Sequence, residues 1–126
     1  MYDESALTPL DPTDLTWAIA WARCFLRDRV TPFVYTDTEL AAALTAHAFL
    51  SGGDTYYRPH VTVANLITTD PDRATSESLL GASITTRSPA SIALGVRVSG
   101  RWVDDVIQNE AGERPPSGRT LRGAAF

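Results

Sequence analysis

The chain has 126 residues, of which 44% are hydrophobic and 21% are charged, and its formal net charge is −4. This length fits one domain with a single modest core, and the composition excludes a wholly disordered chain. The single cysteine, Cys24, excludes an intramolecular disulfide and argues against a thiolate metal site. No apolar run reaches the ~18 residues of a membrane span. The acidic start at residues 1–4 is unlike a secretory signal peptide, so we expect a reducing compartment such as the cytoplasm.

The charge is distributed unevenly along the chain. All 11 basic residues are arginines. Residues 1–56 hold eight acidic residues and three arginines, whereas residues 57–126 hold seven acidic residues and eight arginines. A net acidic chain is a poor candidate for wrapping nucleic acid, because contacts to phosphates need positive charge.

The first helix is expected after a lead-in strand or arm at residues 1–10. Asp11 suits the N-cap and Pro12 the first helical position, and the helical pattern continues to about Val30. Its main apolar face repeats at helical spacing and consists of Leu15, Ala18, Ile19, Ala22, Phe25 and Leu26. A second stripe contains Trp17 and Trp21, which either complete the core or contact another subunit.

A second helix is predicted over Asp37–Leu50. Thr36 and Glu39 have the spacing of a capping box, and Ser51-Gly52-Gly53 is expected to end the helix. His47 is expected on the inner face of this helix as a core histidine.

The next segment favours a third helix from His60 to Thr68, opened by Pro59, although its β-branched residues leave a strand as the alternative. Asp70-Pro71-Asp72 is expected to stop it. Residues 74–87 lack a helical period and predict a long extended loop or loose hairpin.

A fourth helix is predicted from a cap at Ser88 to about Gln108. Gly95 and Gly100 weaken it, and a hairpin turning at Ser99-Gly100 is the competing interpretation. The sequence therefore predicts a mainly α fold, a small bundle of about four helices. Its domain spans residues 1–108, and an extended C-terminal tail spans residues 109–126.

Catalytic motifs are sparse. His60-Val61-Thr62 matches the H-x-T element of two-histidine phosphoesterases, but the second element is absent, since His47 is followed by Ala48-Phe49. The histidines, the cysteine and the carboxylates lack metal-ligand spacing, and no phosphate-binding glycine loop, nucleophile elbow or lysine is present. We therefore expect no enzyme activity, no metal and no cofactor. Asp104 and Asp105 are expected to point to different faces of their helix.

The order of the elements, with local similarity around Tyr35–Leu44, Arg58–Ile67 and Ser76–Gly81, resembles the small head–tail adaptor proteins of long-tailed bacteriophages. The resemblance covers about residues 12–108. It implies a virion structural protein of the neck, made in the host cytoplasm, that forms a ring of usually twelve copies below the portal protein. Such a ring extends the channel through which DNA passes without sequence-specific binding, and it meets a stopper or tail-completion protein below. No membrane is involved.

Two sets of contact residues follow from this interpretation. Docking to the portal is expected from the basic tail, and subunit contacts from the tryptophan stripe and the long loop. The tail residues are Arg114, Arg119, Leu121, Arg122 and Phe126, and the subunit-contact residues are Trp17, Trp21, Ser83, Ile84 and Thr85.

Two alternatives remain open. One is a phosphoesterase-like enzyme that uses His60 and Thr62 and needs a pocket in which His60 meets a second base. The other is a small cytoplasmic helical regulator that binds a protein partner as a monomer or dimer.

Overall fold

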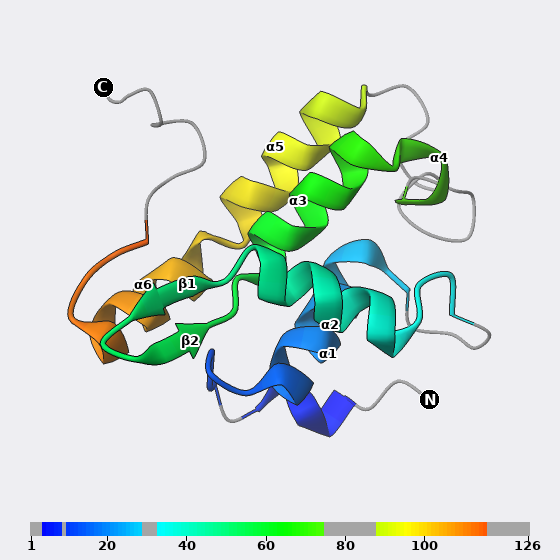
Figure 1. Cartoon of the computed structure of the whole chain (residues 1–126). Coiled ribbons are helices and arrows are strands. Elements are labelled where there is room, and N and C mark those ends of the chain that lie inside the picture. Colours follow the sequence, from blue (N-terminus) through cyan, green and yellow to red (C-terminus); the bar gives the residue numbers. More distant parts are fainter. Residues whose placement is uncertain (1–3, 9, 29–32, 75–87, 116–126) are drawn as a thin grey trace.

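The computed structural model describes residues 4–8, 10–28, 33–74 and 88–115. Figure 1 shows a mainly helical molecule, as predicted. In it α3 (Pro59–Thr69) and α5 (Pro89–Ser99) lie side by side, α1 (Leu15–Leu26) packs against α3, and a short hairpin lies beside α6 (Arg101–Ala111). No helix in these ranges is both long enough and apolar enough to cross a membrane. In chain order the elements are the 3-10 helix η1 (Glu4–Leu7), α1 (Leu15–Leu26), α2 (Asp37–Ala46), β1 (Phe49–Ser51), β2 (Asp54–Tyr56), α3 (Pro59–Thr69), α4 (Pro71–Ala74), α5 (Pro89–Ser99) and α6 (Arg101–Ala111).

The start of α1 differs from the prediction. The N-cap is Asp14, whose carboxylate accepts a hydrogen bond from the backbone N–H of Thr16 at 2.9 Å. Asp11 instead accepts hydrogen bonds from the backbone N–H and hydroxyl of Thr13, so it closes a turn ahead of the helix. The lead-in segment contains a 3-10 helix rather than a strand. The helix ends at Leu26, earlier than predicted, with Arg27 in the left-handed region at φ 64°.

The capping box of α2 is confirmed. The Glu39 backbone N–H donates to the Thr36 hydroxyl at 3.1 Å, and the Thr36 N–H donates to the Glu39 carboxylate at 2.9 Å. The predicted end at Leu50 is wrong, because residues 49–51 pair with residues 54–56 in an antiparallel hairpin. Gly52 and Gly53 form its two-residue turn with φ of 60° and 86°, which glycine adopts without strain.

The prediction of a helix for α3 is confirmed over the strand alternative. The predicted fourth helix consists instead of two helices, α5 and α6, that meet at Gly100, and the competing hairpin is wrong. The predicted cap is present, since Ser88 accepts a hydrogen bond from the backbone N–H of Ser91 at 3.2 Å. Because α6 continues to Ala111, the helical domain extends past the predicted boundary at residue 108.

Gly100 allows the bend between α5 and α6 to lie close to the start of α3. A Cβ at this position would lie 2.1 Å from the Cβ of His60 and 3.2 Å from Phe25 Cζ. Glycine therefore lets the bend rest directly on the start of α3.

The core consists of two adjoining clusters of buried side chains, and the partly buried Ile19 packs against both. The first lies between α1, α3 and α5 and includes Leu26, Val63, Ile67, Ile92 and Val96. The second lies between α1, α2, the hairpin and α6 and includes Trp17, Leu44, Tyr56, Val103 and Ile107. Every helix of eight residues or more contributes to one of them, so the described part of the chain forms one domain.

Candidate functional site

A buried charged cluster joins α3 to α6. Arg58, the residue before α3, donates from Nε and Nη2 to the two carboxylate oxygens of Asp104 on α6, at 2.9 and 3.0 Å. The Nε2 atom of His60 lies 3.2 Å from Asp104 Oδ2. All three side chains are buried, and His60 is only 1% exposed. The cluster therefore links residues that are 44 and 46 positions apart in the chain.

Burial and pairing set the protonation states in this cluster. Burial lowers the pKa of His60, although its hydrogen bond to Asp104 opposes the shift. Burial alone would raise the pKa of Asp104, but the hydrogen bonds from His60 and Arg58 outweigh it and lower that pKa. At neutral pH the cluster thus holds a charged arginine, a charged aspartate and a neutral histidine that donates from Nε2.

This arrangement suits a structural role for His60. A substrate cannot reach a ring that is 1% exposed, and the Nε2 atom is held by a carboxylate rather than by a second imidazole. Thr62 is also fully buried. His60 and Thr62 are two positions apart on α3, and side chains with this spacing do not face each other on a helix. The H-x-T element therefore forms no common site for a phosphate. His47 is half-buried at the C-cap of α2, so it does not complete the inner helical face as expected.

A second buried cluster shapes the connection between α1 and α2. The Asp28 carboxylate accepts hydrogen bonds from the backbone N–H groups of Val34 and Tyr35, at 2.9 and 2.8 Å. Arg23 donates to Asp28, to the Tyr35 carbonyl and to Asp37, the last at 2.6 Å. Arg23 therefore holds the connector that follows α1.

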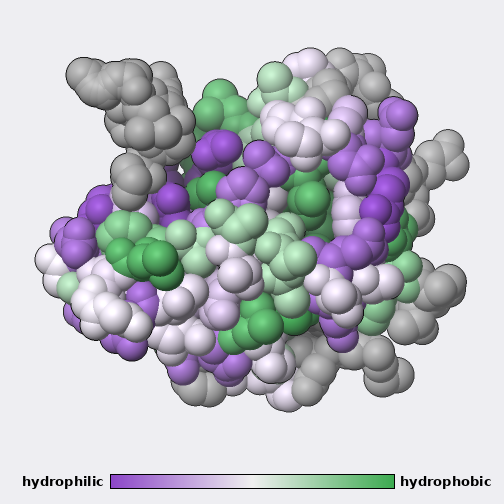
Figure 2. Space-filling view, in the orientation of Figure 1, coloured by the Kyte–Doolittle hydropathy of each residue, from purple (hydrophilic) through white to green (hydrophobic). Residues whose placement is uncertain are grey.

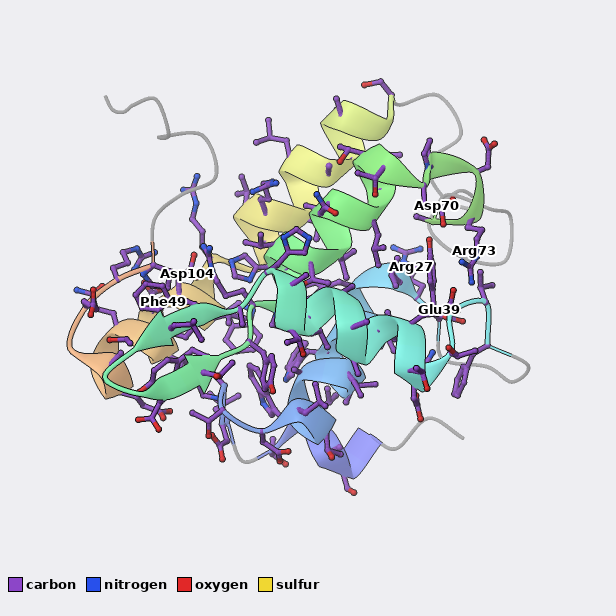
Figure 3. The ribbon with its side chains drawn as sticks, in the orientation of Figure 1. Arg27, Glu39, Phe49, Asp70, Arg73 and Asp104 are labelled. Atoms are coloured by element: carbon purple, nitrogen blue, oxygen red, sulfur yellow. The ribbon has the colours of Figure 1, made fainter. Side chains whose placement is uncertain are left out.

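A third polar group lies at the surface where α4 meets α2. Figure 3 shows Glu39, Asp70 and Arg73 converging there. Arg73 donates to both carboxylate oxygens of Glu39, at 2.8 and 3.0 Å, and to the Val34 carbonyl. The hydrogen bond from Arg73 is the main reason that the pKa of Glu39 falls to about 2. Burial and a hydrogen bond to Asp70 raise the pKa of Tyr35.

The two tryptophans of the predicted stripe differ in burial. Trp17 is 1% exposed and packs edge-on against Trp102 of α6, so it offers no surface to a second subunit and that part of the prediction is wrong. Trp21 is half-buried, contacts Trp102 at 4.8 Å between ring centroids, and donates from Nε1 to the Leu7 carbonyl. A subunit contact by Trp21 stays a prediction.

The predicted docking residues fall mostly outside the described ranges. Arg114 is exposed and contacts Asp105 and Gln108, so it packs along α6. Asp104 is buried and Asp105 exposed, which confirms that they point apart. The residues outside the described ranges are Ser83, Ile84 and Thr85 of the loop and Arg119, Leu121, Arg122 and Phe126 of the tail.

The outer side of α5 carries exposed apolar residues. Leu94 and Val98, one turn apart, are 51% and 49% exposed. Leu50, on the outer face of the hairpin, is 72% exposed. Figure 2 shows hydrophobic residues at the surface over α5 and over the hairpin. These residues are accessible to a partner, whereas the charged clusters above are occupied by internal contacts.

Sequence reasoning missed the Arg58–Asp104–His60 cluster. Its residues match no motif, and their pairing depends on how α3 and α6 pack. The one available signal was Asp104 itself, a carboxylate beside Val103 and one turn from Ile107, on a face that the structure buries.

Within the described ranges, no group of three or more histidine, cysteine or carboxylate residues could hold a metal ion. Comparisons with family models, with curated proteins and with solved structures found no match for this chain.

Proposed function

We propose that the chain is a structural adaptor of a long-tailed bacteriophage, which assembles with copies of itself and with the portal protein between head and tail. The supporting observation is that apolar side chains are exposed on α5. Leu94 and Val98 project from α5 at about half exposure, while the buried carboxylates Asp104 and Asp28 already accept hydrogen bonds from internal partners. Such a distribution suits a protein whose surfaces bind other proteins.

The tail provides the second contact in this proposal. The helical domain ends at Ala111, and Gly112 adopts φ of 81°, which turns the chain out of α6. Residues 116–126 follow with Arg119, Leu121, Arg122 and Phe126, a basic segment with spaced apolar residues. We propose that this segment orders on the portal by coupled folding and binding.

The net charge supports a conduit role. A formal net charge of −4 disfavours tight binding of DNA phosphates. DNA would therefore slide through a ring of such copies without adhering to it.

The test mixes the purified full chain with DNA-filled heads that carry the portal encoded by the same genome. We expect a ring of density below the portal in negative-stain images and co-sedimentation of the chain with the heads. If the chain stays in the supernatant and the portal end is unchanged, the proposed function is wrong.

A truncation after Pro115 tests the role of the tail. The described residues end at Pro115, so removal of residues 116–126 leaves all of them in the chain. We expect the truncated chain to retain the thermal unfolding midpoint of the full chain but to lose binding to the heads. Normal binding by the truncated chain would contradict docking by the tail.

A further inference from the structure

The hairpin points backbone hydrogen-bonding groups outward at both of its edges. Its cross-strand pairs are Phe49–Tyr56, Leu50–Thr55 and Ser51–Asp54. Because a two-residue turn joins the strands, the Ser51–Asp54 pair beside it exchanges both backbone hydrogen bonds, and such pairs alternate with unbonded pairs along an antiparallel ladder. Leu50 and Thr55 are therefore the unbonded pair, and the backbone N–H and C=O of each point away from the other strand.

The two edges differ in what lies against them. On the β2 side, the Tyr57 backbone N–H donates to the Pro12 carbonyl at 2.7 Å, so the segment before α1 follows this edge. On the β1 side, the backbone of Leu50 forms no hydrogen bond with another described residue, and Leu50 is 72% exposed. An unpaired strand edge of this kind can bind a further extended segment through its backbone groups.

Two carboxylates lie at the turn end of the free β1 edge. The Ser51 hydroxyl donates to Glu113 at 2.6 Å, and Asp54 is the cross-strand partner of Ser51. Neither Asp54 nor Glu113 forms a salt bridge within the described ranges. The open edge, which we define as Leu50, Ser51, Asp54 and Glu113, therefore combines an exposed leucine with two negative charges that have no cation bound to them there.

The chain leaves α6 beside this open edge. Glu113 contacts the turn end of β1 through Ser51. Figure 1 shows the described chain passing around the hairpin turn and ending on the β1 side of the hairpin. Residues 116–126 continue from there, and 11 extended residues reach about 36 Å, whereas a three-residue strand is only about 10 Å long. A segment that follows β1 from its turn end runs antiparallel to it.

The composition of residues 116–126 complements the open edge. Leu121 is flanked by Arg119 and Arg122, and the segment contains no acidic side chain. With Leu121 opposite Leu50, the N–H of each leucine can donate to the C=O of the other. In the same antiparallel register Arg119 falls beside the hairpin turn, where the two carboxylates of the open edge lie.

We propose that the open edge binds the tail of the same chain, with residues 119–122 added to β1 as a third, antiparallel strand. The backbone hydrogen bonds between Leu50 and Leu121 align this strand, and the contact of Arg119 with the carboxylates fixes its register. The inference rests on the proposed adaptor function for one consequence only: because the portal binds the same tail, the tail must leave β1 before it docks.

Hydrogen exchange at the Leu50 amide, followed by NMR, tests the pairing in the free full-length chain. The tail covers this N–H in the proposal, whereas water reaches it in the chain truncated after Pro115. We expect exchange at least about threefold slower in the full-length chain than in the truncated chain. The Thr55 amide, on the opposite edge, is the internal control and should exchange at the same rate in both chains.

Two proline substitutions separate strand pairing from the mere presence of the tail. Leu121→Pro removes the N–H that meets Leu50 and should return exchange of the Leu50 amide to the rate of the truncated chain. Ala125→Pro, beyond the proposed strand, is the matched control and should preserve the protection. Both changes lie after Pro115, the last described residue, so all the described residues stay unchanged.

Three results would overturn the inference. They are equal exchange of the Leu50 amide in the full-length and truncated chains, protection that survives Leu121→Pro, and protection that rises with chain concentration, which would assign the open edge to the tail of a second copy. Binding to the heads without protection of Leu50 refutes only the strand pairing. Protection of Leu50 in a chain that never binds the heads refutes only the adaptor function.

Discussion

The described part of the chain contains two buried arginine–aspartate clusters, which stabilise different kinds of structure. Arg23 and Asp28 are five positions apart, and together they fix the connector between α1 and α2. Arg58 and Asp104 are 46 positions apart, and together with His60 they fix α6 against α3. The first cluster determines the path of the chain locally, whereas the second determines how distant helices pack.

The clusters also differ in how their charges are shared. Arg23 has further partners, since it also donates to the Tyr35 carbonyl and to Asp37. Among the described residues, Arg58 and His60 both depend on the single carboxylate of Asp104. Loss of one acidic residue should therefore be costlier in the distant cluster than in the local one.

The largest effect is expected from Asp104→Ala. This change leaves Arg58 buried without its carboxylate and removes the partner of His60, so we expect a loss of about 3–5 kcal/mol in the free energy of unfolding. Urea unfolding measures the loss. Asp105→Ala, next in the chain but exposed and paired at the surface with Arg114, is the control and should cost less than about 1 kcal/mol. Equal losses of stability in the two variants would contradict the larger role that we assign to Asp104.

A smaller loss is expected from Asp28→Ala. Two backbone N–H groups lose their acceptor, but Arg23 keeps Asp37 and a carbonyl, so we expect a loss of about 2–3 kcal/mol. The same urea titration measures it, with Asp37→Ala as the control. Asp37 is 73% exposed in its side chain, so its removal should cost less than about 1 kcal/mol. A loss for Asp28→Ala above that for Asp104→Ala would show that the local cluster is the more important one.

Gly100→Ala tests how closely the bend between α5 and α6 must pack against His60 of the distant cluster. The added methyl group would meet the Cβ of His60 at 2.1 Å, so the bend between α5 and α6 must move away from α3. We expect a loss of about 1–3 kcal/mol, typical of an overfilled core, as measured by thermal and urea unfolding. Ser99→Ala, an exposed neighbour, should be nearly neutral. Equal stability of the Gly100→Ala chain and the wild type would mean that the bend does not need this close approach.

The smallest expected effect is a pH dependence of stability that comes from His60 in the distant cluster. Burial lowers the pKa of His60 below its ordinary 6.5, so the unfolded chain takes up this proton first as the pH falls. The contribution of His60 is fully present above pH 6.5 and is lost as the pH falls toward the folded-state pKa. We expect a loss on the order of 1 kcal/mol between about pH 7 and pH 5.5.

Urea unfolding at several pH values measures this slope. His60→Gln should flatten the slope across this range, whereas His47→Gln, at the C-cap of α2, should preserve the wild-type slope. A slope that persists unchanged in His60→Gln would assign the pH dependence to other groups and remove His60 from the account.

The sequence by itself determined the features that depend on neighbouring residues. The Thr36–Glu39 capping box, the Ser88 cap and the helical nature of α3 follow from residues within four positions of one another, and the structure contains all three. The hairpin also had a local signal, since Gly52-Gly53 is a two-residue turn sequence, but the same glycines suit a helix end. Local rules left that choice open.

Only the tertiary structure decided the rest. The carboxylate of Asp104 meets Arg58 because α3 and α6 pack together. The bend at Gly100 lies against His60, which occupies the space that a side chain would fill. Likewise, Trp17 is a buried member of the second core cluster, whereas Trp21 on the same stripe is only partly covered. Burial and distant pairing depend on which surfaces meet, and that is settled by the packing energy of the whole chain rather than by any short segment.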